Sequence, residues 1–552
     1  MKSRLPSFLL LTCLALAYFL PRVYRIGQYV NPDEPAWLES SAAFYTALRE
    51  GDWAATYRWA HPGVTTMWAG TFGILAQFPD FYEQTREREN FHFDRHLNEF
   101  GFNHLQLLAA SRLFILAEHT AIFLGIALAL RRLLGTAAAA LGAAFIALDP
   151  FLFAHSRFLH AETFLPDLLF LAFLLYLLYL KDYRWRDVLL SGGVFAFSLL
   201  SKSPALLLLP ALGLLSLLRM RQTRQSDAPL LFQDWLKANA LWGLAALVVF
   251  VALWPAMWVQ PLASLQKMAA YIFESSAGQH TSTMFYNGQV IPDGDLGFRF
   301  PWFYPVTFLW RTTPVVLVGL LLAFVALFGL NRVDRDVWLK RALLWFPLLF
   351  MLFLLPTAKK FDRYAIPIYP PLDVLAALGW LWAGNWLRQR WPALRARALP
   401  LVVYGFLIAA QALPVILHAP YYLSYYNPWL GGGPAALDVM MVGWGEGLDE
   451  AARYLNSQPG ASKLNVAAWY AQSFNYHFDG YAVTIPIQFS VGGVPGWLLQ
   501  QDYLVTYVAQ WQRQASWPLL TYLEGFEPDY VVVIDGIEYV RIYNPRTMTP
   551  RP

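Results

Sequence analysis

The chain is poor in charged residues and nearly devoid of cysteine. Of its 552 residues only 14% are Asp, Glu, Lys or Arg, and the one cysteine is Cys13. Soluble proteins carry about 25% charged residues, so a water-soluble enzyme of this length would lack polar surface. A single cysteine excludes an intramolecular disulfide and a thiolate metal cage. The net charge of +4 is small, which argues against a nucleic-acid-binding protein.

Apolar residues are abundant instead, at 57% hydrophobic and 17% aromatic. A helix that crosses the hydrocarbon core, about 30 Å thick, needs about 20 apolar residues. We therefore expect a polytopic α-helical membrane protein of about eleven spans. The candidate spans are residues 5–24, 105–130, 136–153, 163–180, 188–200, 204–218, 238–259, 306–330, 342–356, 366–386 and 399–418. Residues 188–218 are either two thin spans or one broken span.

The loops between these spans differ in charge. The amino-terminal apolar stretch ends at Phe19-Leu20-Pro21-Arg22 without a small-residue cleavage site, so we expect an uncleaved first span. Basic residues then recur in alternate short loops, and the positive-inside rule places these loops and the amino terminus in the cytoplasm. The basic loops are 131–132, 181–186, 219–237, 332–341 and 388–397. The long loop 25–104, the loop 260–305 and the tail are predicted to lie outside.

The tail has a different character from the rest of the chain. Residues 446–457 have acids early and Arg453 late, which is typical of a helix. Short β-rich stretches follow, and Asp535-Gly536 between two of them predicts a hairpin. We expect a transmembrane domain over 1–419, including the outer loop 25–104, and a small α/β or α+β extracytoplasmic domain over 420–552. The predicted strands are 464–470, 503–507, 530–534 and 537–542.

Two adjacent carboxylates, Asp33 and Glu34, follow the first span. Pro35 is suited to the first turn of a helix over residues 36–49, so either acid could cap that helix. Carboxylates at a membrane surface are costly unless they are solvated or used. The alternative is therefore a carboxylate general base at the lip of a cavity, and a cap would also hold such a base in place.

Histidines in the first outer loop offer weaker signals. His61 precedes Pro62-Gly63, and a lone histidine is more often a hydrogen-bonded structural residue than a ligand. His92 and His96 are four residues apart, a spacing that permits a metal site. A solvated amphipathic surface helix is the alternative for that charged stretch.

Two short outer loops concentrate polar groups. The loop 149–162 carries Arg157 and Glu162 together with two histidines. The loop 357–364 carries three cations on the side where short loops are otherwise poor in basic residues, and arginine can bind phosphate through two parallel hydrogen bonds. We expect either capture of a phosphate whose hydrocarbon tail stays in the bilayer, or lipid headgroup binding and snorkelling. The three cations are Lys359, Lys360 and Arg363.

Taken together, these motifs resemble glycosyltransferase family 39, the polytopic lipid-dependent enzymes of the GT-C fold. That family includes protein O-mannosyltransferases and is related to the aminoarabinose transferase of lipid A. The tail is similar to bacterial members at Gly443-Trp444-Gly445-Glu446-Gly447, and it does not resemble the β-trefoil of eukaryotic mannosyltransferases. The motifs that carry the resemblance are Asp33-Glu34, His61-Pro62-Gly63, Arg157 with Glu162, Ser201-Lys202-Ser203-Pro204 and 359–364.

The resemblance implies an inverting transfer from a polyprenyl-phosphate-linked sugar to a protein, lipid or glycan hydroxyl at a plasma (inner) membrane. It implies that Asp33 is the general base with Glu34 beside it, and that the three cations of loop 357–364 bind the donor phosphate. Cations in that place make a metal or other cofactor unnecessary. The candidates for substrate positioning are His61, Arg157, Glu162 and Tyr364. A transporter or flippase of a lipid-linked or anionic solute is the alternative, favoured by the break at Lys202.

Overall fold

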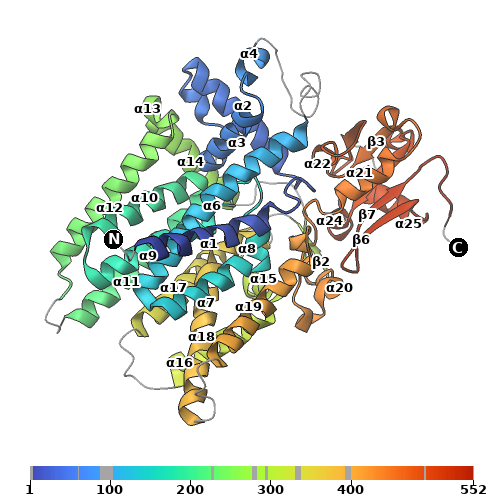
Figure 1. Cartoon of the computed structure of the whole chain (residues 1–552). Helices are drawn as coiled ribbons and strands as arrows, with labels where there is room; N and C mark the ends of the chain where they lie inside the picture. Colours follow the sequence, from blue (N-terminus) through green and yellow to red (C-terminus); the bar gives the residue numbers. More distant parts are fainter. Residues whose placement is uncertain are drawn as a thin grey trace.

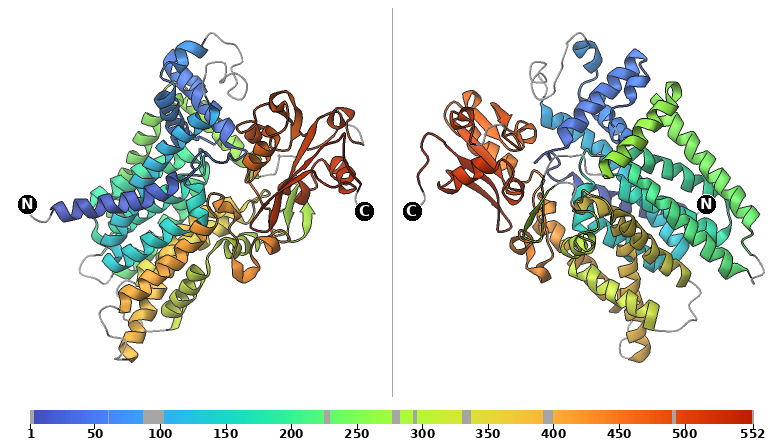
Figure 2. Two further views of the ribbon diagram at one scale, coloured as in Figure 1. Left: turned by 45° about the vertical axis from the view of Figure 1, so that its right-hand side comes forward. Right: turned by 180° about the vertical axis from the view of Figure 1, so that it is seen from behind.

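The chain forms a bundle of long helices with a smaller part, made of a sheet and short helices, at its C-terminal end (Figure 1). The computed structural model describes residues 4–59, 61–86, 103–224, 229–276, 283–292, 296–329, 337–391, 399–489 and 493–550. The amino terminus lies at one end of the molecule and the sheet at the other, as Figure 2 shows.

Helices occupy the apolar segments that the sequence predicts. Six stretches are long and apolar enough to cross a membrane: His104–Leu134, Ser203–Thr223, Phe232–Leu253, Val337–Leu354, Asp362–Arg390 and Leu399–Leu417. This composition makes the chain a multi-pass membrane protein, while the total of eleven spans stays a prediction. The bundle helices are α1 (Arg4–Val23), α6 (His104–Leu134), α7 (Thr136–Leu148), α9 (Leu165–Asp182), α10 (Trp185–Ser201), α11 (Leu208–Thr223), α12 (Phe232–Leu253), α16 (Pro314–Gly329), α17 (Val337–Leu354), α18 (Tyr369–Arg390) and α19 (Leu399–Leu417).

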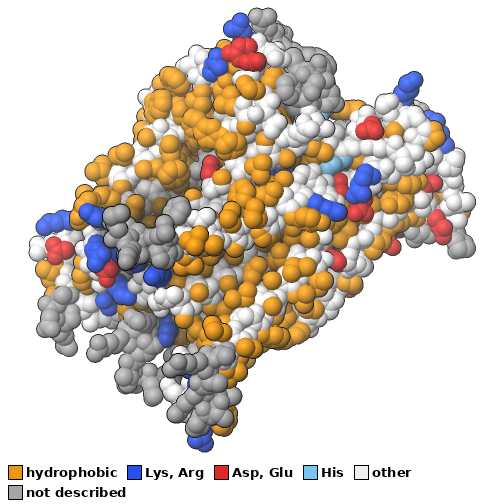
Figure 3. Space-filling view, in the orientation of Figure 1, with side chains coloured by type: hydrophobic (Ala, Val, Ile, Leu, Met, Phe, Trp, Pro, Cys, Tyr) orange, Lys and Arg blue, Asp and Glu red, His pale blue; other side chains and the backbone are white. Residues whose placement is uncertain are grey.

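The outer surface of the bundle is apolar along its length. On α12, Leu244, Leu247 and Val248 are 56%, 58% and 58% exposed. Hydrophobic side chains cover much of the visible bundle face, and Lys and Arg side chains gather at the end of the bundle away from the sheet (Figure 3). Exposed leucine and valine on a long helix match a lipid environment, because lipid tails are as apolar as these side chains.

Two predicted spans are interrupted near a proline. In 136–153 the helix ends at Leu148, and the carboxylate of Asp149 accepts a hydrogen bond from Leu152 N–H as the cap of α8 (Pro150–His155). In 306–330 the extended residue Thr312 separates α15 (Phe303–Arg311) from α16. Proline disfavours a helical conformation in the residue before it, which is Asp149 in the first span and Thr313, next to Thr312, in the second. The prediction of one continuous helix was therefore wrong in both places.

Residues 188–218 form two helices rather than one broken helix. Helices α10 and α11 are joined by Lys202, which is extended, and by a 3₁₀ turn, Ser203–Leu207. Helix α10 packs against α9 and α12, whereas α11 packs against α9 and α17. The junction places Lys202 at the end of the bundle that faces the sheet.

The long loops on that side are mostly helical. The first contains α2 (Glu34–Glu50), α3 (Val64–Gln77) and α4 (Phe81–Thr85), so the helix predicted over 36–49 is confirmed. Helix α3 packs closely on α6, and a Cβ at Gly73 would lie 2.4 Å from the backbone of Ser111. The loop after α12 contains α13 (Ala256–Val259), α14 (Pro261–Ser276), β1 (Met284–Tyr286) and β2 (Gln289–Ile291).

The C-terminal part contains a five-stranded sheet of order β4-β3-β5-β7-β6. Strands β4, β3 and β5 run parallel, and β7 is antiparallel to β5 and β6. Both residues of the β6–β7 turn, Asp535 and Gly536, have positive φ, as that hairpin turn requires. The predicted helix, hairpin and strands are confirmed, whereas the short strand β4 was not predicted. The elements are α20 (Gly432–Ala436), α21 (Leu448–Asn456), β3 (Asn465–Ala468), α22 (Ala471–Phe474), β4 (Tyr481–Thr484), α23 (Gly496–Leu499), β5 (Tyr503–Tyr507), α24 (Val508–Gln512), α25 (Trp517–Glu524), β6 (Tyr530–Ile534) and β7 (Ile537–Tyr543).

The C-terminal part packs directly on the bundle. The guanidinium of Arg311 donates hydrogen bonds to the carbonyl oxygens of Leu423 (2.6 Å) and Tyr425 (3.2 Å). Tyr286 of β1 pairs with Met440 in an isolated β-bridge. Buried side chains of both parts belong to one hydrophobic cluster. The division at residues 419 and 420 stays a prediction.

Candidate active site

The turn before α2 presents Asp33. The side-chain oxygen of Asn31 accepts hydrogen bonds from the backbone N–H of Asp33 (2.9 Å) and of Glu34 (3.2 Å), and Glu34 accepts one from Asn31 N–H (3.1 Å). This reciprocal pattern is a capping box. Asn31 is therefore the cap, in place of the two acids that the sequence suggested, and the Asp33 carboxylate makes no capping bond.

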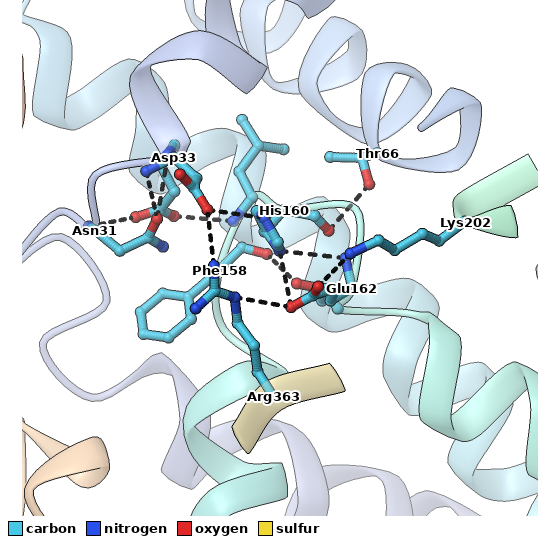
Figure 4. A network of polar contacts seen from close by, with 11 residues as sticks. Asn31, Asp33, Thr66, Phe158, His160, Glu162, Lys202 and Arg363 are labelled. Atoms are coloured by element: carbon cyan, nitrogen blue, oxygen red, sulfur yellow. Dashed lines mark hydrogen bonds and ion pairs between the residues drawn. The ribbon is translucent and has the colours of Figure 1, made fainter. Parts of the chain in front are cut away.

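The Asp33 carboxylate faces His160, from the loop between α8 and α9 (Figure 4). Nε2 of His160 lies 3.2 Å from Oδ2 of Asp33, and Nδ1 accepts the backbone N–H of Glu162 at 3.2 Å. Because Nδ1 is an acceptor, the ring proton belongs on Nε2 and points to Asp33. Burial alone would raise the pKa of Asp33, but His160 and the charge of Arg363 lower it below its ordinary 3.8. Asp33 is therefore ionised at neutral pH.

Glu162 holds two cations. One carboxylate oxygen contacts the ammonium of Lys202, and the other lies 3.2 Å from Nε of Arg363 (Figure 4). The Glu162 side chain is only 2% exposed. Burial would raise the pKa of Glu162, but the positive charges of Lys202 and Arg363 lower it well below the usual range. The buried carboxylate thus fixes both cations in place.

Arg363 connects the two carboxylates. Its Nη2 lies 3.9 Å from Oδ2 of Asp33, whereas a different nitrogen, Nε, faces Glu162. The guanidinium carbon lies 4.2 Å from the ring centre of Phe361 and 4.8 Å from that of Trp444. Carboxylates at residues 33 and 162 and a guanidinium at residue 363, far apart in sequence, therefore form one cluster.

A polar cavity of about 270 Å³ opens on the Asp33 side of this cluster. The Asp33 side chain is 41% exposed. Burial lowers the pKa of His155 on the cavity wall to about 3, so that imidazole is neutral. Residues of both parts of the chain line the cavity, among them Asp33, Lys359 and Arg363 from the membrane part and Trp444, Glu446 and Tyr470 from the C-terminal part.

An apolar cavity of about 470 Å³ lies on the Glu162 side. Its charged lining residues are Glu162, Lys202, Lys359 and Arg363, and His61 and Tyr364 also line it. Most of the remaining wall is aliphatic or aromatic: Leu165, Leu206, Leu207, Ile272, Phe353 and Leu354. Lys359 and Arg363 line both cavities, so the two spaces meet at these cations.

His61 and Tyr364 support this wall. Nδ1 of His61 lies 3.2 Å from the hydroxyl of Ser203, and its ring contacts Tyr271 edge-on at 4.7 Å. The Tyr364 ring lies 4.9 Å from the ammonium of Lys202. A Cβ at Gly63 would lie 2.2 Å from the Trp37 ring, so the turn after His61 requires glycine. Both predicted positioning residues thus lie at the apolar cavity.

Glu34 lies elsewhere, although it is next to Asp33. Its side chain is fully buried and accepts two hydrogen bonds from the guanidinium of Arg112 and one from the backbone N–H of Leu159. Both carboxylate oxygens are occupied by these donors. Glu34 therefore ties α2 to α6 and lines neither cavity, and its assignment to the catalytic group stays a prediction.

Arg157 and Lys360 also lie outside both cavities. Arg157 is 5% exposed, donates to the carbonyl of Tyr24 (2.6 Å) and packs on the ring of Tyr422. The ammonium of Lys360 donates to the carbonyls of Leu355 (2.6 Å) and of Leu354 (3.3 Å) at the end of α17. Burial lowers the pKa of Lys360 to about 8. Both side chains are thus bonded to backbone carbonyls and line neither cavity, and the assignments of Arg157 to substrate positioning and of Lys360 to phosphate binding stay predictions.

Sequence reasoning did not select His160, Lys202 or Trp444 as site residues. His160 stands two residues before Glu162, in a loop already recognised as rich in polar groups, and Lys202 belongs to the motif between α10 and α11. The ring of Trp444 lies edge-on to His160 at 5.2 Å. The available signals were the position of Lys202 between two apolar segments and the glycines on either side of Trp444.

Two further features lie apart from this site. A larger polar cavity of about 610 Å³ lies where residues 25–28 and the start of α6 meet α21 and residues 475–479, and it contains none of the predicted site residues. Among the residues that the structure describes, no group of three or more His, Cys, Asp or Glu is arranged to hold a metal ion. The pair His92 and His96 falls outside the described residues.

Residues 100–258 match the family described as dolichyl-phosphate-mannose-protein mannosyltransferase. The matched segment runs from α6 to α13 and carries His160, Glu162 and Lys202. The match confirms the resemblance to glycosyltransferases of the GT-C fold. No curated protein matches the chain in sequence.

Solved structures similar to this chain include two proteins from other organisms. ArnT from Cupriavidus metallidurans bound to undecaprenyl phosphate is 14% identical, with 97% of this chain and 98% of that chain covered and a TM-score of 0.48. The oligosaccharyltransferase AglB from Archaeoglobus fulgidus, in complex with an inhibitory peptide and a dolichol-phosphate, is 11% identical. The similarity to AglB covers 97% of this chain and 74% of that chain, with a TM-score of 0.48.

Proposed function

We propose that this protein transfers a sugar from a polyprenyl-phosphate-linked donor to a hydroxyl of a protein, lipid or glycan acceptor. The observation that carries the proposal is the position of Arg363, where the apolar cavity meets the polar cavity, 3.9 Å from Asp33. A prenyl-phosphate sugar has a hydrocarbon tail, an anion and a polar ring in that order. The two cavities and the cations between them follow the same order.

The apolar cavity takes the prenyl chain and the cations take the phosphate. Lys359 and Arg363 line both cavities, and Lys202 lines the apolar one. A guanidinium binds phosphate through charge-assisted hydrogen bonds with defined geometry. Glu162 keeps Lys202 and Arg363 close together, since two cations would otherwise repel each other in a buried site.

The reaction is a single displacement. Asp33 removes the proton from the acceptor hydroxyl, whose oxygen forms a bond to the anomeric carbon on the face opposite the phosphate. The bond from that carbon to the phosphate oxygen breaks, its electron pair stays on the phosphate, and the configuration inverts. General-base assistance is worth about 10²–10⁴-fold in rate. His160 orients the Asp33 carboxylate through the Nε2–H hydrogen bond.

The leaving group needs charge stabilisation rather than a proton donor. Lys359 and Arg363 supply fixed positive charge where the phosphate develops its negative charge, and such preorganised charge is usually the largest catalytic contribution. The proposed reaction therefore requires no divalent metal and no other cofactor.

The site is proposed to work at the outer face of a plasma membrane. Lys and Arg side chains gather at the end of the bundle away from the sheet, which the positive-inside rule assigns to the cytoplasm (Figure 3). Both cavities lie toward the opposite end: the polar one between the bundle and the C-terminal part, and the apolar one among residues of the membrane part. The sheet and the acceptor would then be extracytoplasmic.

The decisive experiment uses purified protein in nanodiscs with radiolabelled undecaprenyl-phosphate hexoses and a membrane extract as the source of acceptor. Asp33→Asn should lower the rate of covalent transfer by about 10²–10⁴-fold. The affinity for undecaprenyl phosphate should stay within a few-fold of the wild-type value. Asp52→Asn, an exposed carboxylate in the same loop, is the matched control. Excess chelator should leave wild-type turnover unchanged.

Near-normal transfer by Asp33→Asn would disprove the base assignment. A parallel assay in sealed vesicles addresses transport. If the labelled lipid-linked sugar crosses the membrane and no label is joined to an acceptor, the protein is a flippase and the proposed transferase function is wrong.

A further inference from the structure

The segment Gly443–Gly447 of the C-terminal part forms one wall of the polar cavity. Gly443, Gly445 and Gly447 have φ of 89°, 107° and 82°, values that side chains rarely adopt. A Cβ at Gly445 would lie 2.5 Å from the carbonyl oxygen of Val30. The glycines therefore let this segment approach the turn that carries Asp33, and this approach brings Trp444 and Glu446 to the cavity.

Trp444 covers the reacting groups. Its ring lies 4.8 Å from the guanidinium carbon of Arg363 and edge-on to His160. Tyr470 lines the same cavity. Aromatic faces beside charged side chains form a surface that suits a ring with apolar C–H faces and polar edges.

Glu446 brings a carboxyl group that the proposed reaction does not use. It is 1% exposed, and Oε2 accepts hydrogen bonds from Trp444 N–H (2.5 Å) and from the hydroxyl of Tyr507 (3.1 Å). Oε1 is buried and has no hydrogen-bond partner among the described residues. Burial raises the pKa of Glu446. An unsatisfied buried acceptor is costly, and a hydrogen bond from a ligand hydroxyl would remove that cost.

The proposed function decides which part of a ligand reaches this carboxyl. With the prenyl chain in the apolar cavity and the phosphate at Lys359 and Arg363, the group attached to the phosphate must enter the polar cavity. That group is the sugar that is transferred.

We propose that Glu446 determines the sugar specificity, by accepting a hydrogen bond from a ring hydroxyl of the donor sugar in the polar cavity. The inference rests on the proposed function. It makes the C-terminal part a contributor to the donor site, in which Trp444 covers the ring and Glu446 selects it.

The test compares lipids with and without the sugar. Nanodisc-embedded wild type, Glu446→Gln and the exposed control Glu524→Gln are titrated with undecaprenyl phosphate and with its glucose, mannose and galactose derivatives. In the wild type at least one derivative should bind more tightly than undecaprenyl phosphate. Glu446→Gln should reduce this advantage by about tenfold or more and leave undecaprenyl phosphate binding unchanged, and Glu524→Gln should change neither.

The ratio of the two affinities separates the outcomes. The inference is overturned if no derivative binds more tightly than the bare lipid, or if Glu446→Gln changes both affinities equally. Loss of bare-lipid binding in Arg363→Met tests the proposed function separately, because no sugar is present. If Glu446→Gln does not fold, Glu446→Asp keeps the charge but withdraws the oxygens, and the same selective loss is expected.

Discussion

The same kinds of charged side chain line the two cavities and are buried in the protein around them, but they have different partners in the two places. Asp33 lines a cavity, while its neighbour Glu34 is fully buried against Arg112. Lys359 lines both cavities, while Lys360 binds backbone carbonyls at the end of α17. The difference shows that charge type and sequence position do not identify a reactive group. A cavity residue leaves room for a ligand, whereas a packed residue has its bonding capacity filled by the protein.

The largest effect is expected when a charge is removed from a buried ion pair such as Glu34 and Arg112. Glu34→Gln leaves the buried guanidinium of Arg112 without its ionic partner, and breaking such a pair costs about 3–5 kcal/mol in free energy of unfolding. Chemical unfolding in detergent should show this loss, whereas Asp33→Asn should change stability far less. A stable but inactive Glu34→Gln protein would support the catalytic role that the resemblance implied.

The next largest effect concerns the cation shared by the cavities. Arg363→Met should lower transfer by about 10²–10³-fold, since it removes a preorganised charge from the leaving phosphate. Binding of undecaprenyl phosphate should weaken in the same variant. Arg546→Met, at an exposed arginine near the carboxyl terminus, is the control, measured by radiolabel transfer and lipid titration. Unchanged lipid binding in Arg363→Met would refute the phosphate site.

The adjacent residues Lys359 and Lys360 are expected to differ in the same way, one affecting lipid binding and the other stability. Lys359→Met should weaken binding of undecaprenyl phosphate by about tenfold, the equivalent of about 1.4 kcal/mol, without a large loss of stability. Lys360→Met should instead lower the free energy of unfolding by about 1 kcal/mol, because two carbonyls at the end of α17 lose their donor. Lipid titration and unfolding of both variants check the contrast. The reverse pattern would place Lys360 at the phosphate.

The smallest effect is a shift in pH dependence. Asp33 acts as the carboxylate, and its pKa lies below 3.8, so transfer should stay constant from neutral pH downward and fall only as Asp33 becomes protonated. In His160→Leu the hydrogen bond that lowers this pKa is lost, so the acidic limb should move to higher pH. His160→Gln keeps a donor and should shift it less. The measurement is the pH–rate profile of the wild type, His160→Leu and His160→Gln. Identical acidic limbs would show that His160 does not lower the pKa of Asp33.

The sequence predicted much of the fold and part of the site. The bundle helices follow from continuous apolar stretches, and the β6–β7 hairpin follows from Asp535-Gly536, because both signals are local. Asp33 and Arg363 were selected because they lie next to predicted spans on the outer side. His160 and Lys202 were not selected, since their importance depends on contacts with Asp33 and Glu162 that no local pattern records.

Hydrophobicity adds up along a segment, so the sequence alone determined that this is a membrane protein, and it predicts which loops share a side. The tertiary structure decided which member of each adjacent charged pair faces a cavity. For Asp33 and Glu34, that choice depends on the capping box at Asn31 and on the burial of Glu34 by α6. It also depends on the segment around Trp444, which lies more than 400 residues after them in the chain. The environment of a charge is set by the groups that surround it in space, and these come from distant parts of the sequence.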